Sequence, residues 1–252
     1  MIIRETDEAF VMTTQDDHGR FSGEVAQGFR DDILPEGVYR EGCLLGIREH
    51  DRCWIRLDAE PVWNDADGVP FTFIDYPVRP KLLLYQIGLA EIESMSKYAA
   101  LLCSMHFGSF FKNDPDSLSD PERAFYQGEL KRQERLFEEL GHPDEQMASR
   151  HFQLLQLCDD ISLYVCMNRE GASKAEEHPW FRHGFKSLID GQRYMAEWSG
   201  SRDIRITPFP FVSEWSVVMR SKHVSKRRIT EAGINRAYQE SDWIDLKVTF
   251  VR

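Results

Sequence analysis

A histidine directly precedes an aspartate at His50–Asp51. Ile47 and Trp54 recur at helical spacing around the pair, which predicts a helix over 40–57 with both polar side chains on an apolar stripe. A buried imidazole and carboxylate cost free energy unless they are hydrogen-bonded or bind a metal ion. The pair is therefore either a structural hydrogen bond or part of a metal site.

Three further polar residues, His18, His106 and Asp159, lie on apolar faces of other predicted helices. Together with His50 and Asp51 they supply three imidazoles and two carboxylates. Divalent transition-metal ions accept this combination of nitrogen and oxygen donors. We expect these five side chains to bind one or two divalent ions, with Fe, Mn, Zn, Ni and Mg as candidates.

The order of these residues resembles the HD superfamily of metal-dependent phosphohydrolases. That family has a His on one helix, a His-Asp pair on a second and a distant Asp on a later helix, which correspond here to His18, His50–Asp51 and Asp159. The resemblance implies a helical core that holds one metal ion. It also implies that Asp51 bridges to a second ion where one is present, and that His106 completes this second site or contacts substrate.

Short segments around these residues also look like an uncharacterised bacterial family of unknown function, over roughly residues 1–170. The segments are Thr14–His18, Arg48–Trp54, Ser104–His106 and Leu154–Asp159. The chain has neither the His-His pair nor the Gly-Tyr-Pro motif of specific HD phosphodiesterase classes. Those classes are therefore disfavoured.

The resemblance implies hydrolysis of a phosphorylated small molecule or nucleotide, with Asp51 and His106 as catalytic residues. Arg48, Arg52 and Lys97 are candidate phosphate-binding residues, because guanidinium and ammonium groups neutralise phosphate oxygens. The HD family also includes iron-dependent oxygenases that use nearly the same cage. An oxygenase is therefore one alternative, and a non-catalytic binding module is another.

Periodicity predicts which elements position these residues. Helices are expected over 17–29, 40–57, 81–94, 98–111, 121–140 and 143–167. Strands are expected over 2–4, 9–14, 204–206, 215–219 and 243–250. We expect one domain over 1–252 of mainly α class: an HD-like helical core over 16–199, and a β-rich appendage over 200–252. In this appendage we expect the C-terminal strands to form a small antiparallel sheet, with or without the N-terminal hairpin.

Composition narrows the functional classes. The formal net charge of −11 argues against broad nucleic-acid binding. No apolar run approaches the ~20 residues that span a bilayer, and the first residues do not form a signal peptide. The five cysteines contain no Cys-x-x-Cys pair, which is typical of buried reduced thiols. We expect a cytoplasmic protein without membrane contact, in which an exposed sheet edge offers a contact for a homo-oligomer.

Overall fold

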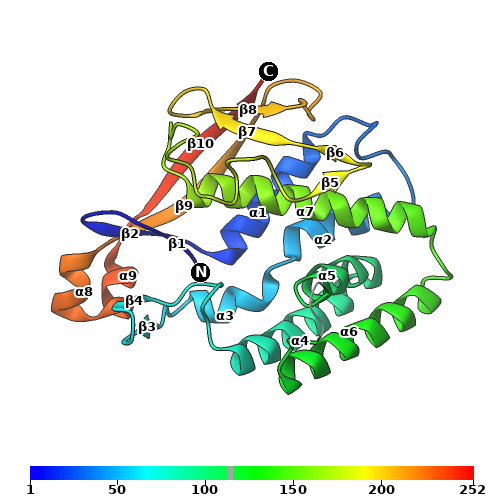
Figure 1. Cartoon of the computed structure of the whole chain (residues 1–252), viewed down its shortest axis with the longest axis horizontal. Coiled ribbons are helices and arrows are strands. Elements are labelled where there is room, and N and C mark those ends of the chain that lie inside the picture. The colour runs from blue at the N-terminus through cyan, green and yellow to red at the C-terminus, as the bar shows by residue number, and fades with distance from the viewer. Residues whose placement is uncertain (113–115) are drawn as a thin grey trace.

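Helix α7 (Glu145–Met167) runs between a curled β-sheet and a layer of helices in the computed structural model, which describes residues 1–112 and 116–252 (Figure 1). Helices α1 (Gln15–Gln27) and α2 (Arg40–Glu49) pack beside α7. The layer away from the sheet consists of α4 (Val78–Met95), α5 (Lys97–Ser109) and α6 (Asp120–Glu139). None of the helices in the described ranges is both long enough and apolar enough to cross a membrane.

The large sheet has six strands from both ends of the chain. Their spatial order is β1 (Ile2–Glu5), β2 (Ala9–Thr13), β9 (Trp215–Ser225), β10 (Trp243–Val251), β8 (Asp203–Thr207) and β7 (Met195–Trp198). Neighbouring strands are antiparallel except for β10 and β8, which are parallel. The short helices α8 (Lys226–Ala232) and α9 (Ile234–Glu240) connect β9 to β10.

Two small hairpins lie outside the large sheet. They are β3 (Trp63–Asn64) with β4 (Val69–Pro70), and β5 (Leu188–Ile189) with β6 (Gln192–Arg193). The second hairpin follows the loop after α7 and contacts that helix. It therefore borders the region where Asp159 lies.

The predicted fold class, a mainly α protein with an HD-like core and a small antiparallel sheet, is wrong. Helices account for 47% of the residues and strands for 19%, and the sheet is a mixed half-barrel. Strands β5, β6 and β7 lie within 188–198, where no strand was expected. The parallel pairing of β8 with β10 joins segments about 45 residues apart in the sequence, which local patterns do not record.

One hydrophobic cluster joins the helices to the sheet. Phe21 of α1 packs edge-to-face on Phe250 of β10, with ring centroids 6.2 Å apart, and both side chains are fully buried. The cluster also contains Leu155 of α7 and Ile204 of β8. The core therefore includes residues from both sides of the expected boundary near residue 200. All five cysteines are buried and free, as predicted.

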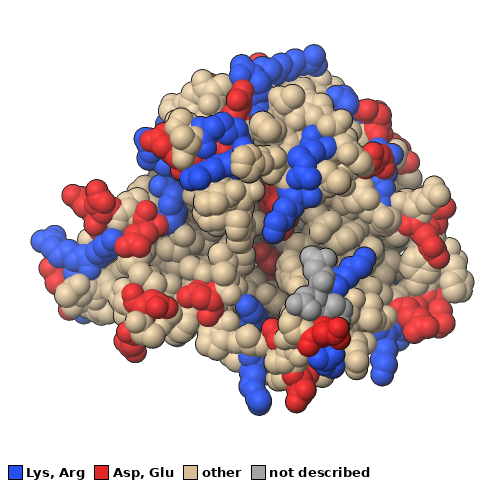
Figure 2. All heavy atoms as spheres, in the orientation of Figure 1, with Lys and Arg blue, Asp and Glu red and all other residues tan. Residues whose placement is uncertain are grey.

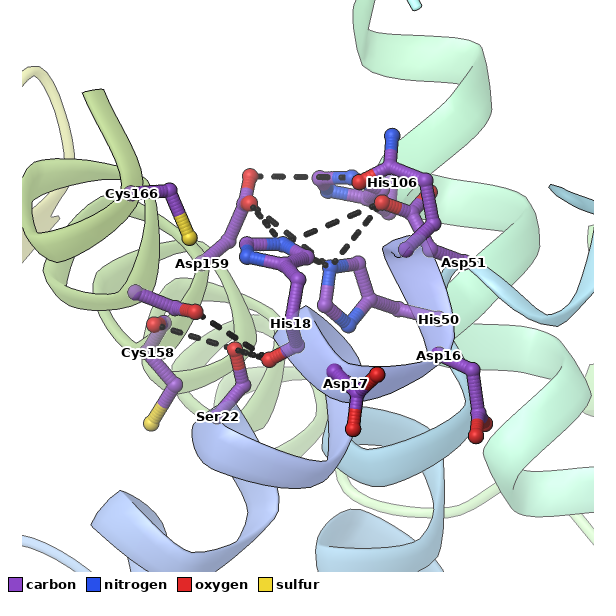
Figure 3. A network of polar contacts seen from close by, with 12 residues as sticks. Asp16, Asp17, His18, Ser22, His50, Asp51, His106, Cys158, Asp159 and Cys166 are labelled. Atoms are coloured by element: carbon purple, nitrogen blue, oxygen red, sulfur yellow. Dashed lines mark hydrogen bonds and ion pairs between the residues drawn. The ribbon is translucent and has the colours of Figure 1, made fainter. Parts of the chain in front are cut away.

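The predicted helix over 40–57 is interrupted at the His-Asp pair. Helix α2 ends at Glu49, and a 3₁₀ turn (η1, Arg52–Trp54) leads into the short helix α3 (Ile55–Asp58). Consecutive residues of a continuous α-helix point about 100° apart. The interruption removes this restriction, so that the His50 and Asp51 side chains turn toward the same centre (Figure 3).

Close packing of α1 on α2 places His18 beside His50. A Cβ atom on Gly19 would lie 2.6 Å from the Arg48 carbonyl oxygen, and one on Gly23 would lie 3.1 Å from Arg48 Cβ. The first distance is shorter than any tolerable contact with a backbone atom. Gly19 is therefore required for this approach of the two helices.

The substitution Gly19→Ala should lower the free energy of unfolding by about 1–3 kcal/mol, because the new methyl group forces α1 away from α2. Gly128→Ala is the matched control: Gly128 is an exposed helical glycine of α6 with no atom within 4 Å of the added Cβ. This control should raise stability by about 0.5–1 kcal/mol through helix propensity. Chemical denaturation measures both, and shifts of the same sign would contradict the close packing.

Candidate metal centre

Four donor atoms from three segments converge at one point (Figure 3). His18 Nε2 lies 3.1 Å from His50 Nε2 and 3.0 Å from Asp159 Oδ1. Asp51 Oδ2 lies 3.8 Å from His18 Nε2 and 3.7 Å from His50 Nε2. Ligands ~2.1 Å from one ion are roughly 3.0–3.8 Å apart when the angles at the ion are roughly 90–130°. His18, His50 and Asp51 therefore have the spacing of ligands to a common ion, and Asp159 Oδ1 lies at a similar distance from both imidazoles.

His106 of α5 lies on the other side of Asp159. Its Nε2 is 3.8 Å from Asp159 Oδ2, whereas Asp159 Oδ1 faces His18. Two overlapping groups can each hold a metal ion: His18, His50 and Asp51, and His50, His106 and Asp159. The structure thus brings together all five predicted ligands. Asp159 therefore has one oxygen toward His18 and the other toward His106, which is the position of a bridging carboxylate. The family resemblance implied the bridging position for Asp51 instead.

Hydrogen bonds outside the donor set orient the His50 ring and hold the backbone at His18. His50 Nδ1 lies 2.7 Å from the Ile47 carbonyl oxygen, so it donates there and leaves Nε2 free to face the centre. The Ser162 hydroxyl donates to the His18 carbonyl oxygen at 3.1 Å. The Ser22 hydroxyl lies within 3.2 Å of the carbonyl oxygens of His18 and Cys158. These contacts hold α1 against α7 next to His18 and Asp159.

The centre is buried and its charges are strongly coupled. His18 and His50 are fully buried, and the Asp51 and Asp159 side chains are 12% and 18% exposed. Burial by itself lowers the pKa of His50, but Asp51 and Asp159 outweigh it and raise the pKa to about 9. Burial by itself raises the pKa of Asp159, but hydrogen bonds from His18 and His50 outweigh it and hold the pKa well below its usual range. A cation at this point is therefore stabilised.

A pocket of about 830 Å³ reaches the centre, and Asp51, His106 and Asp159 are among its lining residues. Figure 2 shows a hollow near the middle of this face, with acidic side chains in its depth and basic side chains beside it. Organic ligands of moderate size occupy pockets of roughly 300–1,000 Å³. The candidate metal site is thus accessible to a small molecule.

The three cations expected to bind phosphate, Arg48, Arg52 and Lys97, do not line this pocket. Each forms an ion pair with a carboxylate instead. The pairs are Arg48 with Asp16 at 3.1 Å, Arg52 with Glu49 at 2.9 Å and Lys97 with Glu139 at 2.9 Å. Their proximity to the motifs in the sequence does not place them near the donor atoms.

The lysines that do line the pocket were not predicted from the sequence, namely Lys81, Lys112 and Lys186. Lys81 Nζ faces the carbonyl oxygens of Phe73 and Ile74 at 3.5 and 3.3 Å. No carboxylate in the described ranges lies within 4.0 Å of the Lys81 or Lys186 ammonium group. Lys81 is the fourth residue of α4 and Lys186 lies in a loop, so no motif marks either residue.

Gln15 was also missed, although its position carried a signal. It lies three residues before His18 and therefore shares a face of α1 with that ligand. It is only 1% exposed and lines the pocket, yet its Oε1 has no hydrogen-bond partner in the described part of the chain. Its backbone N–H donates to Asp58 Oδ2 at 2.6 Å, which holds the residue in place. An unpaired acceptor therefore borders the pocket.

A family model described as "Protein of unknown function (DUF3891)" matches residues 1–226, and the chain belongs to that family. The match includes all five candidate ligands, together with Gln15, Lys81 and Lys186. Searches of curated proteins and of solved structures found no match.

Binding of a divalent ion to the metal-free protein should release a proton from His50, because a coordinated imidazole nitrogen cannot keep its proton. With the His50 pKa at about 9, nearly one proton is released at pH 7 and metal affinity rises with pH until about pH 9. Calorimetry in buffers of different ionisation enthalpy measures this proton release.

His18→Ala should weaken metal binding, whereas His142→Ala should leave it unchanged because His142 is an exposed loop residue remote from the donor set.

A metal affinity that is constant between pH 7 and pH 9 would contradict a protonated His50 in the metal-free protein.

Proposed function

We propose that this DUF3891 protein is a metal-dependent phosphohydrolase that cleaves an organic phosphate ester. The observation that carries the proposal is the convergence of three imidazoles and two carboxylates beside a pocket. The same pocket contains Lys81 and Lys186, neither of which has an ion-pair partner in the described part of the chain. The order of His18, His50–Asp51 and Asp159 adds support through its resemblance to the HD superfamily.

The proposed roles follow from the donor set. His18, His50, Asp51 and Asp159 would hold one divalent ion, and His106 with the second oxygen of Asp159 would hold another or contact the substrate. A bound divalent ion lowers the pKa of a coordinated water to about 7 and polarises a phosphoryl oxygen. The protein itself keeps the donor atoms in place through the Ile47, Ser22 and Ser162 contacts.

The pocket residues would bind and orient the ester. Lys81 and Lys186 offer positive charge to phosphate oxygens. The unpaired Gln15 Oε1 would accept a hydrogen bond from the attacking water or from a hydroxyl group of the substrate. Such an acceptor restricts the orientation of the water, which lowers the entropic part of the barrier.

The first test is phosphate release from a panel of phosphate esters by the full chain loaded in turn with Mn²⁺, Zn²⁺, Fe²⁺, Ni²⁺ and Mg²⁺. At least one ion should support turnover, and Asp51→Asn should reduce kcat/KM more than about 100-fold, because several kcal/mol of transition-state stabilisation depend on the metal site. His142→Ala should retain full activity. Substrate-dependent oxygen consumption without phosphate release would contradict the proposal and favour the iron-dependent oxygenase.

Gln15→Leu should lower kcat about 10- to 100-fold through loss of orientation, while metal affinity stays unchanged. Gln156→Leu is the control, because Gln156 lines the same pocket but its side chain has no buried unpaired atom. Steady-state kinetics and metal titration measure the two effects. Equal losses of kcat in Gln15→Leu and Gln156→Leu would contradict the proposed role of Gln15 in orienting the water or the substrate.

A further inference from the structure

Exposed apolar side chains gather around the mouth of the pocket. Among the large hydrophobic residues that are exposed in the described ranges, five line this one pocket. We call them the apolar collar: Ile74, Val78, Phe110, Trp180 and Leu188. They come from four segments that are distant in the sequence. Exposed apolar groups that converge in this way commonly mark a binding surface.

The two aromatic residues of the collar are held in place. Phe110 follows His106 by one helical turn, and the two rings meet edge-to-face with centroids 4.8 Å apart. Trp180 precedes Phe181, which is 2% exposed and packs on Tyr164. The buried anchor at Phe181 fixes the loop while Trp180 stays 42% exposed. Both aromatic side chains are therefore displayed by ordered backbone.

The aliphatic residues of the collar lie on similarly ordered segments. Ile74 is part of a turn in which Thr72 and Asp75 are hydrogen-bonded, with Thr72 Oγ1 donating to Asp75 Oδ1 at 2.6 Å. Leu188 follows Ser187, whose hydroxyl donates to Asp160 Oδ2 at 2.6 Å. These contacts attach the β5–β6 hairpin to α7 beside the candidate metal ligand Asp159. The collar and the metal centre thus line the same pocket.

Charge is distributed along the same pocket. The candidate metal ligands that line it are largely buried, with the Asp51 and Asp159 side chains 12% and 18% exposed, and Lys186 Nζ is 5.9 Å from the centre of the exposed Trp180 ring. Lys81 comes from the same helix as Val78. A ligand that matches both the cationic groups of the pocket and the apolar collar has an anionic group and an apolar body. A compact polar body such as a sugar would leave the collar in contact with water.

We propose that the pocket selects phosphate esters with an apolar organic part, an aryl or alkyl group that packs against the collar. This inference rests on the proposed phosphohydrolase function. Apolar contact with the ring faces of Phe110 and Trp180 would contribute binding without changing the charge of the ligand. The substrate would therefore be an amphipathic phosphate ester of a small molecule.

Binding of phosphonates separates this inference from the hydrolysis itself, because their phosphorus–carbon bond is not an ester bond. We expect the protein, with and without added Mn²⁺, to bind benzylphosphonate about 30-fold more tightly than methylphosphonate, which corresponds to about 2 kcal/mol. The polar probe 2,3-dihydroxypropylphosphonate should bind no more tightly than methylphosphonate. Isothermal titration calorimetry measures all three affinities.

Trp180→Ser should remove most of the preference for benzylphosphonate and leave methylphosphonate binding unchanged. Trp243→Ser is the matched control, because Trp243 is 40% exposed but lies on β10 outside the pocket. Phe110→Leu, which keeps an apolar side chain, should retain part of the preference.

Equal affinities for the benzyl and methyl probes would overturn the inference even if phosphate esters are hydrolysed. A preference for the benzyl probe in a protein that hydrolyses no ester would retain the amphipathic ligand class and reject the hydrolase. Light scattering adds one further outcome: a dimer that dissociates in Trp180→Ser would assign the collar to contact between two copies of the chain and overturn the inference.

Discussion

Two buried imidazole nitrogens that face each other set the main constraint on this structure. His18 Nε2 and His50 Nε2 lie 3.1 Å apart with no access to solvent. Two neutral lone pairs at that distance repel each other, so a proton or a metal cation must lie between them. The carboxylates of Asp51 and Asp159 stabilise the positive charge of a protonated His50 or of a bound cation. The glycine contact of α1 with α2 and the serine contacts of α1 with α7 keep the four groups together.

The clustering of these five side chains was predictable from the sequence because each is a polar residue within an apolar pattern. Charged and imidazole side chains are rarely buried unless they are paired or bind a metal ion. The pocket cations were not predictable in the same way. Arg48 lies next to the pair in the sequence but forms an ion pair with Asp16, whereas Lys186 reaches the pocket only because the loop after α7 folds back over that helix.

The fold was predictable at the level of its elements and not at the level of their assembly. The N-terminal hairpin, helices α4 to α7 and strands β8 to β10 lie close to their expected positions. The sheet was underestimated because its pairings join the two ends of the chain, as in the contact between β2 and β9. The helix break after Glu49 was missed because apolar spacing continues across it to Trp54. Local periodicity therefore predicts the positions of most elements, whereas tertiary packing determines how the strands pair and where the helix breaks.

Anomalous X-ray diffraction from crystals of the metal-loaded protein would show whether these four side chains hold a metal ion. We expect an anomalous peak about 2.0–2.2 Å from His18 Nε2, His50 Nε2 and oxygen atoms of Asp51 and Asp159. A second peak next to His106 would fit a second ion. Density that shows these side chains ordered as in Figure 3 with no peak among them, or with the metal bound elsewhere on the chain, would contradict a metal site at these residues.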